Sequence, residues 1–591
     1  MKDVVFGLSQ QFAPDSNGIR TSVAVNRSGN TLEVHQSQSL DTLWCRVGHT
    51  RQLDTRWNGS SKYDSGIDPS VCLNDHNVAI EVHSSENWSK LWYHVGTVSE
   101  SKVDWGSSHK YDSGMLPSIA LDNDNWCVEA HSSEGAATGL WYRLGKVDAG
   151  KKTINWVTGS NKYGKGYRPR VAMNNQGVVV EVHNNEVTHN ALWYTVGILD
   201  KQSNTIHWGE SKSYGNGGTQ PSVAITDDGF VIEVHKSEGH GTLWRHVGTV
   251  NTQNKTIDWS GSAYFDDGQE PSVACASDGS IAIQTHQSEN SSSLWYATSL
   301  IADRSRWMET LYDRLQDRPL WRITIPGSHD AGAYNMQTNR TPCGDAPSWL
   351  PGAVVRLFAE THTLDLGGQL DNGIRFFDLR PYVDKQGKFY AYHDVIGASF
   401  ETMLDQIATF LKYTRKEFVI LKISHFCSFT DERHKELVSL IDAKIGEYLY
   451  KGSDGALLTT PFGQLVSQGS RCAVWYDATL KPFPDSFYRN ICMYDDYANS
   501  EDYETMRKDQ LKKMKENPGT ESRLFLLSWT LTFSEFSDIE KGLTLHVISK
   551  KANRHLGEFL ATEAGGYQVN IVYVDFPEDA RATDCVIALN R

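Results

Sequence analysis

The chain has 591 residues, and at roughly 150 residues per domain this length predicts two to four domains. Hydrophobic residues make up 39% and charged residues 22%, which is the composition of a folded protein and not of a disordered one. The 57 basic and 72 acidic residues give a net charge of −15, which excludes nucleic acid as an expected partner and leaves no polybasic route to anionic lipid.

The N-terminal residues MKDVVFGLSQQF lack the apolar core of a secretory signal peptide, and no run of about 18 apolar residues follows them. We therefore expect a protein that is cytoplasmic or exported by a non-Sec route. The nine cysteines are an odd number, no pair has zinc-finger spacing, and those of the first half fall at unrelated positions of a repeat. Reduced thiols are the expectation.

Residues 1–300 contain six copies of one unit with a period of 48 to 52 residues. Each copy holds four short runs typical of strands, which lie around an opening aromatic residue, in PSVAL, in VxIEVH and in LWYxVG. Four strands in about 50 residues is typical of one blade of a β-propeller. The sequence predicts a six-bladed β-propeller, in which Phe6 takes the place of the opening Trp so that the ring closes without a C-terminal strand. A linear β-solenoid is the alternative.

Every copy also keeps a His, a Trp nine or ten residues after it and, in five copies, a Glu two residues before it. These residues could form one glycan pocket per blade, with the Trp stacked on a sugar face, or could recur because every blade packs alike. Single His residues about 50 positions apart are not expected to bind metal. The set comprises His35, His83, His131, His183, His235 and His286, with Trp44, Trp92, Trp141, Trp193, Trp244 and Trp295, and with Glu33, Glu81, Glu129, Glu181, Glu233 and Gln284.

Near residue 300 the period stops, and apolar runs alternate with helical stretches such as SFETMLDQIATFLKYTRKE and DYETMRKDQLKKMKEN. This pattern predicts an α/β (β/α)8 barrel of the TIM type, regular or distorted, over residues 301–591. The runs are WRITIPG, GIRFFDLRPY, KFYAYHD, FVILKIS, RCAVWYD, RLFLLSWT and VNIVYVDF, and nearly all end in a polar or ionisable residue. In a barrel the strand ends share one mouth, where we expect His329, Arg380, His393, Lys422, Asp477 and Asp575.

Two of these runs end in a His that is followed directly by Asp, in GSHDAG and in YAYHD. Two imidazoles and a guanidinium make a metal-free acid–base pair with an anion clamp. Cleavage of a phosphodiester needs such a set, because one imidazole deprotonates the attacking hydroxyl and the other protonates the leaving oxygen. The guanidinium neutralises the charge that builds on the phosphoryl oxygens.

The blocks ITIPGSHDAGAY, QLDNGIRFFDLRPY and FYAYHD resemble the X region of the phosphatidylinositol-specific phospholipase C family, and the similarity runs from about residue 303 to the C-terminus. The resemblance implies that His329 is the general base, His393 the general acid and Arg380 the phosphate ligand. It also implies that Asp330 supports the general acid and that Asp575, late in the last strand, supports the general base.

Other residues match contacts of the lipid headgroup in that family. Asp378 lies two residues before the phosphate ligand, and MYDDY resembles a block with a binding Asp and a stacking Tyr, here Asp495 and Tyr497. Lys422 and Asp477, at two further strand ends, complete the predicted substrate-binding set. Asp477 stands where bacterial enzymes place a basic contact, which leaves the identity of the headgroup open.

The calcium-dependent branch of the family has Asn after the first His, Glu-x-Asp at the end of the second strand and Glu on the fourth strand, all as calcium ligands. Here these places hold Asp330, Asp378 with Arg380, and Ser424. An Arg where calcium would sit supplies the positive charge itself. The resemblance therefore implies a bacterial-type enzyme that is independent of calcium and needs no other cofactor.

The segment SWLPGAVVRLFAETH, between the first two blocks, carries an apolar series that could dock on lipid or pack over the barrel mouth. The predicted partner is an inositol phospholipid at a membrane surface, cleaved to diacylglycerol and a cyclic inositol phosphate. One alternative is a metal-dependent glycerophosphodiesterase of the same barrel superfamily, although its Glu-x-Asp pair after the first His is missing. The other alternative is a lectin or scaffold protein whose propeller binds glycans.

Overall fold

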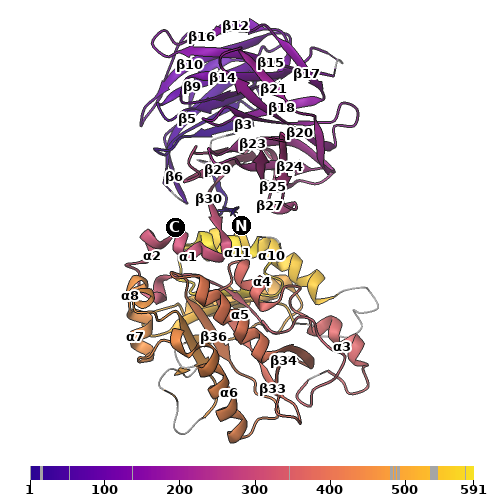
Figure 1. The fold of residues 1–591 in the computed structure, drawn as a ribbon, viewed down its shortest axis with the longest axis vertical. Helices are drawn as coiled ribbons and strands as arrows, with labels where there is room; N and C mark the ends of the chain where they lie inside the picture. The colour runs from indigo at the N-terminus through magenta and orange to yellow at the C-terminus, as the bar shows by residue number, and fades with distance from the viewer. Residues whose placement is uncertain are drawn as a thin grey trace. The chain divides into compact units, whose positions relative to one another are not determined.

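The computed structural model describes residues 2–12, 17–51, 53–135, 138–344, 346–479, 484, 487–488, 493–532, 544–579 and 581–590. The chain divides into two compact units, residues 2–301 and residues 302–591 (Figure 1). Among the described residues, no helix combines the length and the apolar character that crossing a lipid bilayer requires.

The first unit consists of six antiparallel sheets, each with four strands in series and a short fifth strand paired with the third. The first sheet comprises β3 (Ile19–Val25), β4 (Asn30–Gln36), β5 (Thr42–Arg51), β6 (Asp54–Trp57) and β7 (Ser61–Ser65). The second comprises β8 (Ile67–Leu73), β9 (Val78–Ser84), β10 (Leu91–Val98), β11 (Val103–Trp105) and β12 (His109–Asp112). The third comprises β13 (Met115–Leu121), β14 (Trp126–Ser132), β15 (Gly139–Asp148), β16 (Thr153–Trp156) and β17 (Asn161–Lys165). The fourth comprises β18 (Tyr167–Met173), β19 (Val178–Asn184), β20 (Ala191–Asp200), β21 (Thr205–Trp208) and β22 (Lys212–Asn216). The fifth comprises β23 (Gly218–Ile225), β24 (Phe230–Ser237), β25 (Thr242–Asn251), β26 (Thr256–Trp259) and β27 (Ala263–Asp267). The sixth comprises β28 (Gln269–Cys275), β29 (Ala282–Gln287), β30 (Leu294–Asp303), β1 (Lys2–Phe6) and β2 (Gln10–Gln11).

The second strand of each sheet is buried on both faces. In β9, Val78 and Ile80 belong to one apolar cluster, whereas the intervening Ala79 belongs to another. Because alternate side chains of a strand point to opposite faces, this strand lies between two layers of neighbours. Hydrogen bonds also connect consecutive sheets, as where Val71 N donates to Ser22 Oγ at 3.1 Å. One repeat therefore cannot bury its apolar surface alone.

The prediction of a six-bladed propeller with four-stranded blades is wrong. Each sheet has five strands, because the polar stretch of the SKYDS type pairs with the third strand after a shift of register. That stretch lacks apolar alternation and gives no strand signal. The expectation about Phe6 is also wrong, since β1 and β2 join the last repeat in the sixth sheet. The same pairing excludes the linear solenoid.

The second unit is built on a parallel sheet of eight strands in the order β38-β37-β36-β32-β31-β41-β40-β39, with a separate antiparallel sheet β33-β34-β35. The parallel strands are β31 (Ile325–Ser328), β32 (Phe376–Leu379), β36 (Val419–Ile423), β37 (Cys472–Tyr476), β38 (Phe487–Tyr488), β39 (Met493–Asp495), β40 (Leu524–Trp529) and β41 (Ile571–Val574). The antiparallel strands are β33 (Pro381–Val383), β34 (Phe389–His393) and β35 (Val395–Ser399).

Helices cover the parallel sheet, and Figure 1 shows α4, α5 and α6 outside the strand β36. In α5 the Ser399 side chain caps the N-terminus, and Met403, Leu404 and Ile407 form its buried stripe. Both predicted helical stretches are confirmed as α5 and α9. The α-helices are α1 (Trp307–Thr310), α2 (Tyr312–Leu315), α3 (Gly352–Ala359), α4 (Leu366–Asp371), α5 (Phe400–Tyr413), α6 (Asp431–Ile445), α7 (Asp454–Thr459), α8 (Phe462–Ser467), α9 (Tyr503–Glu516), α10 (Leu545–Ala561) and α11 (Ala582–Ala588). Short 3-10 turns are η1 (Arg304–Arg306), η2 (Leu320–Arg322) and η3 (Gly446–Tyr448).

The predicted closed (β/α)8 barrel is also wrong. Within the described residues the parallel sheet is open, since its edge strands β38 and β39 do not pair with each other. The run KFYAYHD, expected as a barrel strand, is β34 of the antiparallel sheet. A short apolar run looks the same in either sheet, because its pattern does not specify the partner strand.

The expectation of reduced thiols needs a correction as well. Cys343 and Cys427 form a disulfide, with a Cα–Cα distance of 5.8 Å and 84 positions between them in the sequence. Cys45, Cys72, Cys127, Cys275 and Cys472 are free thiols.

A fully buried ion pair stabilises the N-terminal edge of the parallel sheet. Arg375 Nε donates to Glu417 Oε2 at 2.8 Å, and the other guanidinium nitrogens donate to backbone carbonyls that include Leu370 O. Replacing Glu417 by Ala leaves this buried charge unpaired, which we expect to lower the free energy of unfolding by about 3–5 kcal/mol. Urea unfolding of the full chain measures the loss. The exposed Glu447→Ala is the control, and an equal effect of both changes would contradict the prediction.

Candidate active site

Three adjacent parallel strands bring the predicted catalytic residues to one edge of the sheet. β31 lies between β32 and β41, and the residues that follow these strands are His329, Arg380 and Asp575. The carboxyl ends of parallel strands share one edge, which is the usual place for a site in α/β proteins. The adjacent strands thus explain why residues far apart in the sequence meet.

His329 has a different partner on each ring nitrogen. Its Nδ1 lies 2.8 Å from Asp575 Oδ1, and its Nε2 lies 3.0 Å from Arg380 Nη2. A guanidinium can only donate, so Nε2 must accept and Nδ1 must carry the hydrogen that is donated to Asp575. This tautomer leaves on Nε2 the lone pair that a general base uses.

Two carboxylates determine the proton affinity of His329. Burial alone would lower its pKa, but the negative charges of Asp330 and Asp575 outweigh burial, so the pKa is raised above 6.5. Asp575 is itself held in place, because Asn553 Nδ2 donates to its backbone carbonyl at 2.8 Å. The imidazolium form of His329 is therefore stabilised.

Asp330 lies between the two predicted catalytic imidazoles. It is buried, and its Oδ2 is 3.6 Å from both His329 Nε2 and His393 Nδ1. His393 Nδ1 also donates to Ala359 O at 2.9 Å, since a carbonyl oxygen can only accept. This leaves Nε2 of His393 as the nitrogen for a substrate.

Arg380 connects these groups. Its Nε forms an ion pair with Asp330, and its Nη2 lies 3.2 Å from Asp378 Oδ2. Burial works against the charged form, but the two carboxylates outweigh it and raise the pKa of Arg380 well above its usual value. The guanidinium is therefore charged at every pH at which the protein folds.

The substrate-binding candidates divide into two groups. Lys422 forms an ion pair with Asp495 and lies 3.8 Å from Asp378 Oδ1, so these three residues are brought together beside Arg380. Tyr497 is 54% exposed and Asp477 is exposed at the end of β37. Among the described residues, no hydrogen bond or ion pair joins either side chain to the group.

The His and Glu residues that recur in the repeats are buried and bond to each other, whereas the recurring Trp residues are half-buried. Glu81 is fully buried and accepts from His83 Nδ1 at 3.0 Å, and the pairs of the first, third, fourth and fifth sheets have the same arrangement. A carboxylate in this position is not accessible to a sugar. The structure therefore gives no support to a glycan pocket formed by the His, the Glu and the Trp.

Comparisons with known proteins agree with the sequence motifs. No protein-family model matches the chain. A PI-PLC X domain-containing protein 3 of Danio rerio is 27% identical over 315 residues, which are 48% of this chain and 92% of that protein. A PI-PLC X domain-containing protein of Dictyostelium discoideum is 29% identical over 200 residues, but the chain spans only 33% of that protein. The resemblance to the PI-PLC X-region family is confirmed.

A likeness to solved structures is also present. The phosphatidylinositol-specific phospholipase C from Listeria monocytogenes has 20% sequence identity and a TM-score of 0.37, over 49% of this chain and 99% of that chain. A phosphatidylinositol-specific phospholipase C from Staphylococcus aureus has 17% identity and the same TM-score, over 49% of this chain.

Three residues near the candidate site in residues 302–591, which we call the PI-PLC X-like unit, were not predicted from the sequence. His425 lies in the left-handed region at φ 57°, and burial together with Arg380 lowers its pKa. His362 is buried, and its Nε2 lies 2.9 Å from Ser328 Oγ and 2.6 Å from His329 O. Tyr573 places its ring 5.1 Å from that of His329. His425 directly follows the run FVILKIS, so its position at a strand end could have indicated it. His362 lies in an irregular segment in which no sequence pattern marks a site residue.

One group in the PI-PLC X-like unit has the composition of a metal site. His329, Asp330 and Asp378 each offer a ligand atom, and these atoms lie within 4.8 Å of one another. Arg380 contacts all three residues through its guanidinium. A cationic side chain thus already occupies the place where these groups converge.

The apolar segment SWLPGAVVRLFAETH has features of both interpretations, packing on the unit and docking on lipid. Leu350 and Val355 are buried in a cluster with Val395, as a helix packed on the unit requires. Trp349 is 74% exposed and Leu357 is 45% exposed, as a lipid-facing surface requires. The segment also includes Ala359, whose carbonyl holds His393.

Proposed function

We propose that residues 301–591 cleave phosphatidylinositol, or a related inositol phospholipid, into diacylglycerol and a cyclic inositol phosphate. The observation that carries this proposal is the placement of His329 and His393, both 3.6 Å from Asp330 Oδ2, with Arg380 between the carboxylates. Two imidazoles beside one guanidinium suit a phosphodiester that is attacked by a neighbouring hydroxyl of its own headgroup.

The first half of the reaction uses His329. Its Nε2 takes the proton of the inositol 2-hydroxyl, whose oxygen then forms a bond to phosphorus. Asp575 stabilises the resulting imidazolium through the 2.8 Å contact at Nδ1. Arg380 transfers its Nη2 hydrogen bond from His329 to a phosphoryl oxygen, where the negative charge builds.

The second half uses His393. As the bond between phosphorus and the diacylglycerol oxygen breaks, Nε2 of His393 gives its proton to that oxygen. The hydrogen bond from His393 Nδ1 to Ala359 O, at 2.9 Å, holds the ring in place for this transfer. The products are diacylglycerol and a five-membered cyclic phosphate, and the proton taken by His329 restores His393 through solvent.

The proposal includes independence from calcium. Its support is the guanidinium of Arg380, which supplies positive charge within the group of His329, Asp330 and Asp378. A divalent ion at that point would have to displace an arginine that two carboxylates hold. The metal-dependent glycerophosphodiesterase is therefore the less favoured alternative.

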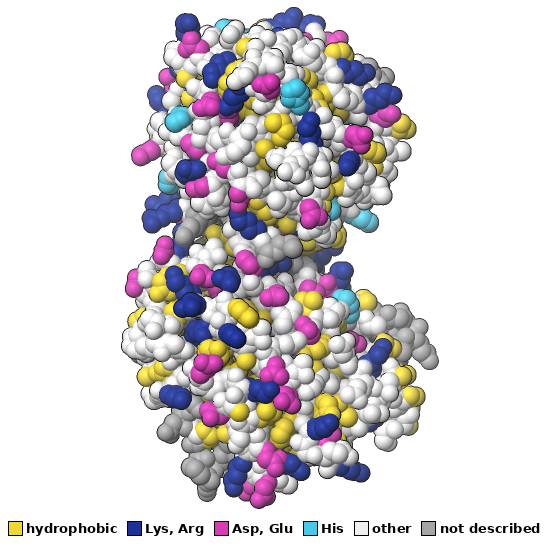
Figure 2. Space-filling model, viewed as in Figure 1, with side chains coloured by type: hydrophobic (Ala, Val, Ile, Leu, Met, Phe, Trp, Pro, Cys, Tyr) yellow, Lys and Arg dark blue, Asp and Glu magenta, His cyan; other side chains and the backbone are white. Residues whose placement is uncertain are grey.

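The membrane is proposed as the place of reaction. Trp349 and Leu357 are exposed apolar side chains on the segment that contains Ala359, whose carbonyl bonds to His393. Their insertion among lipid tails would bring the headgroup to the site. Basic and acidic side chains are interspersed on the face shown in Figure 2, as expected for docking that does not depend on charge.

Phosphorus NMR of the full chain with phosphatidylinositol micelles tests the proposal. In excess EDTA we expect a cyclic phosphate signal, and we expect His329→Ala to abolish it. Activity that returns only with added calcium would overturn the metal-independent mechanism and favour the glycerophosphodiesterase. Absence of any product under both conditions would overturn the proposed cleavage of phosphatidylinositol and favour a binding protein.

The pH dependence of catalysis tests the pairing of His329 with Asp575. The base must be neutral, so kcat/KM should fall as the pH drops through a pKa that lies above 6.5. Asp575→Asn removes one of the charges that raise this pKa, and the acidic limb should then move to lower pH. Asp579→Asn is the control, because Asp579 pairs with His546 instead. An unchanged limb in Asp575→Asn would contradict the assignment.

A further inference from the structure

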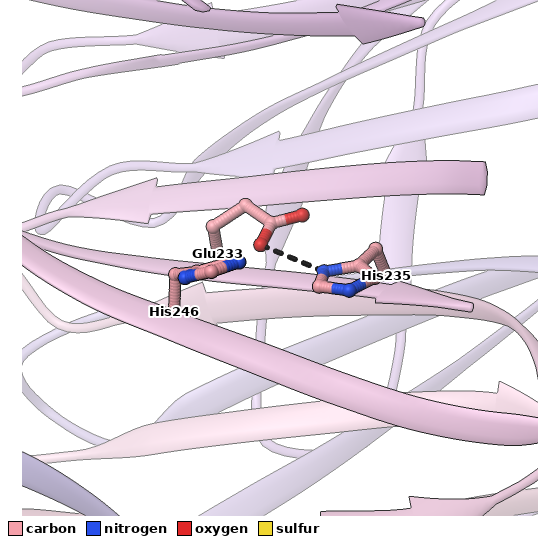
Figure 3. Close-up of side chains that lie close together, drawn as sticks. All are labelled: Glu233, His235 and His246. Atoms are coloured by element: carbon pink, nitrogen blue, oxygen red, sulfur yellow. Dashed lines mark hydrogen bonds and ion pairs between the residues drawn. The ribbon is translucent and has the colours of Figure 1, made fainter. Parts of the chain in front are cut away.

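Three buried side chains come together in the fifth sheet of the repeat unit. Glu233 and His235 lie on β24, and His246 lies directly opposite Glu233 on β25. One ligand atom from each residue lies within 4.8 Å of the other two. Figure 3 shows the two imidazoles on either side of the carboxylate, with one carboxylate oxygen directed toward His235.

His246 carries a lone pair on the nitrogen that is not bonded to the backbone. Its Nδ1 lies 3.3 Å from Ser260 O, and since a carbonyl only accepts, Nδ1 bears the hydrogen. Nε2 is then unprotonated in the neutral ring. An imidazole held by a backbone carbonyl on one nitrogen is the usual form of a metal-binding histidine.

Glu233 is buried between polar neighbours. Its Oε2 accepts from His235 Nδ1 at 3.0 Å, and the side chain of Tyr214 interacts with the same carboxylate. A buried carboxylate needs such partners in place of water, and a metal ion is a further group that can fill this role.

The first sheet shows a cation in the equivalent position. Arg46 stands opposite Glu33 there, and its Nε donates to Glu33 Oε2 at 2.8 Å. The fifth sheet has His246 at that place, so the guanidinium is missing. The residues opposite the Glu or Gln in the other sheets are His94, Arg143, Thr195 and Ala297.

The second sheet has the same three residue types but a different arrangement. His94 Nε2 donates to Asp64 Oδ2, a carboxylate on β7 of the preceding sheet, at 2.7 Å, and so this nitrogen offers no lone pair to a metal. In the fifth sheet, the position equivalent to Asp64 is Gly215 on β22. A Cβ at Gly215 would lie only 3.7 Å from His246 Nε2, so the missing carboxylate is the group that would occupy this nitrogen.

We infer that Glu233, His235 and His246 bind a divalent transition metal, with zinc the best match. Two imidazoles and one carboxylate are a common zinc set, with water in a fourth position. His235 would bind through a ring nitrogen made available when the metal displaces its hydrogen bond to Glu233. The ligands lie on adjacent strands of one repeat, so the spacing of about 50 residues between repeat histidines does not bear on this site.

Titration of the full chain, first freed of metal by chelation and dialysis, tests the inference with Zn²⁺ by calorimetry and with Co²⁺ by visible absorption. We expect one equivalent with tetrahedral cobalt bands, weakened at least tenfold in His246→Ala and retained in His94→Ala. Zinc should raise the Tm of the wild type and not that of His246→Ala. Ala297 occupies this position in the sixth sheet, so alanine is compatible with the fold. Retention of the equivalent in His246→Ala would overturn the inference, as would an absence of binding in the wild type.

A substitution in the second sheet gives a second test that removes no ligand. Asp64→Gly should release His94 and create a second equivalent with Glu81 and His83. Another variant, His329→Ala, should leave the stoichiometry unchanged and thereby excludes binding at the catalytic group. An unchanged stoichiometry in Asp64→Gly would contradict the role assigned to the free imidazole nitrogen.

Discussion

Replacing His329 with alanine is expected to reduce the rate of phosphatidylinositol cleavage by about 10² to 10⁴-fold, because the attacking hydroxyl then loses its general base. The loss should be in kcat more than in KM, since His329 acts on the reacting oxygen. Steady-state kinetics with mixed micelles measures it. His555→Ala is the matched control, because His555 contacts the ring of Tyr503 on α9.

The acid and the base can be distinguished by the leaving group. In a nitrophenyl ester of inositol phosphate the leaving group is nitrophenolate, which needs no proton to depart. His393→Ala should therefore lose much less activity on this substrate than on the lipid. His329→Ala should lose activity on both substrates. Equal losses for His393→Ala on the two substrates would show that His393 does not act as the general acid.

Replacing Arg380 with alanine is the second large expected effect, a loss of about 10² to 10³-fold in kcat. The mutation removes the charge that faces the phosphoryl oxygens and leaves Asp330 and Asp378 without their shared partner. Arg380→Lys should recover only part of the activity, because an ammonium cannot bond to both carboxylates in the same geometry. Thermal unfolding of each variant separates a loss of catalysis from a loss of folding.

Calcium provides the control for Arg380. The wild type should be equally active in EDTA and in calcium, and calcium should not restore Arg380→Ala to wild-type rates. Full recovery of Arg380→Ala with calcium would show that the ion and the guanidinium are interchangeable, which would contradict the proposed role of the arginine.

Much of the candidate site could be predicted, because strand ends in a parallel sheet share one edge. His329, Arg380 and Asp575 follow three adjacent strands, and the motif blocks identified all three. Asp477 was grouped with them by the same rule but lies at the end of β37, three strands away from β31. At about 4.8 Å between neighbouring strands, that separation exceeds the reach of an aspartate. The order of the strands in the sheet therefore decides which residues belong to the site, and apolar runs in the sequence do not specify that order.

The fold was predicted less completely for a similar reason. The repeat period, the buried strands and the two helices α5 and α9 follow from patterns of neighbouring residues. The fifth strand of each sheet, the joining of β1 to β30 and the antiparallel pairing of β34 depend on contacts between distant segments. Period and composition constrain such pairings only weakly.

The covalent link between Cys343 and Cys427 makes the second unit sensitive to its chemical surroundings. The loop that it closes contains the strand ends that carry Arg380 and His393, and Cys427 itself is two residues from His425. In the chain-entropy model, closing a loop of 84 residues lowers the conformational entropy of the unfolded chain. This stabilises the folded state by about 4 to 5 kcal/mol. A reductant should therefore lower the temperature at which this unit unfolds, and cleavage activity would depend on the thiol–disulfide balance of the medium as well as on heat.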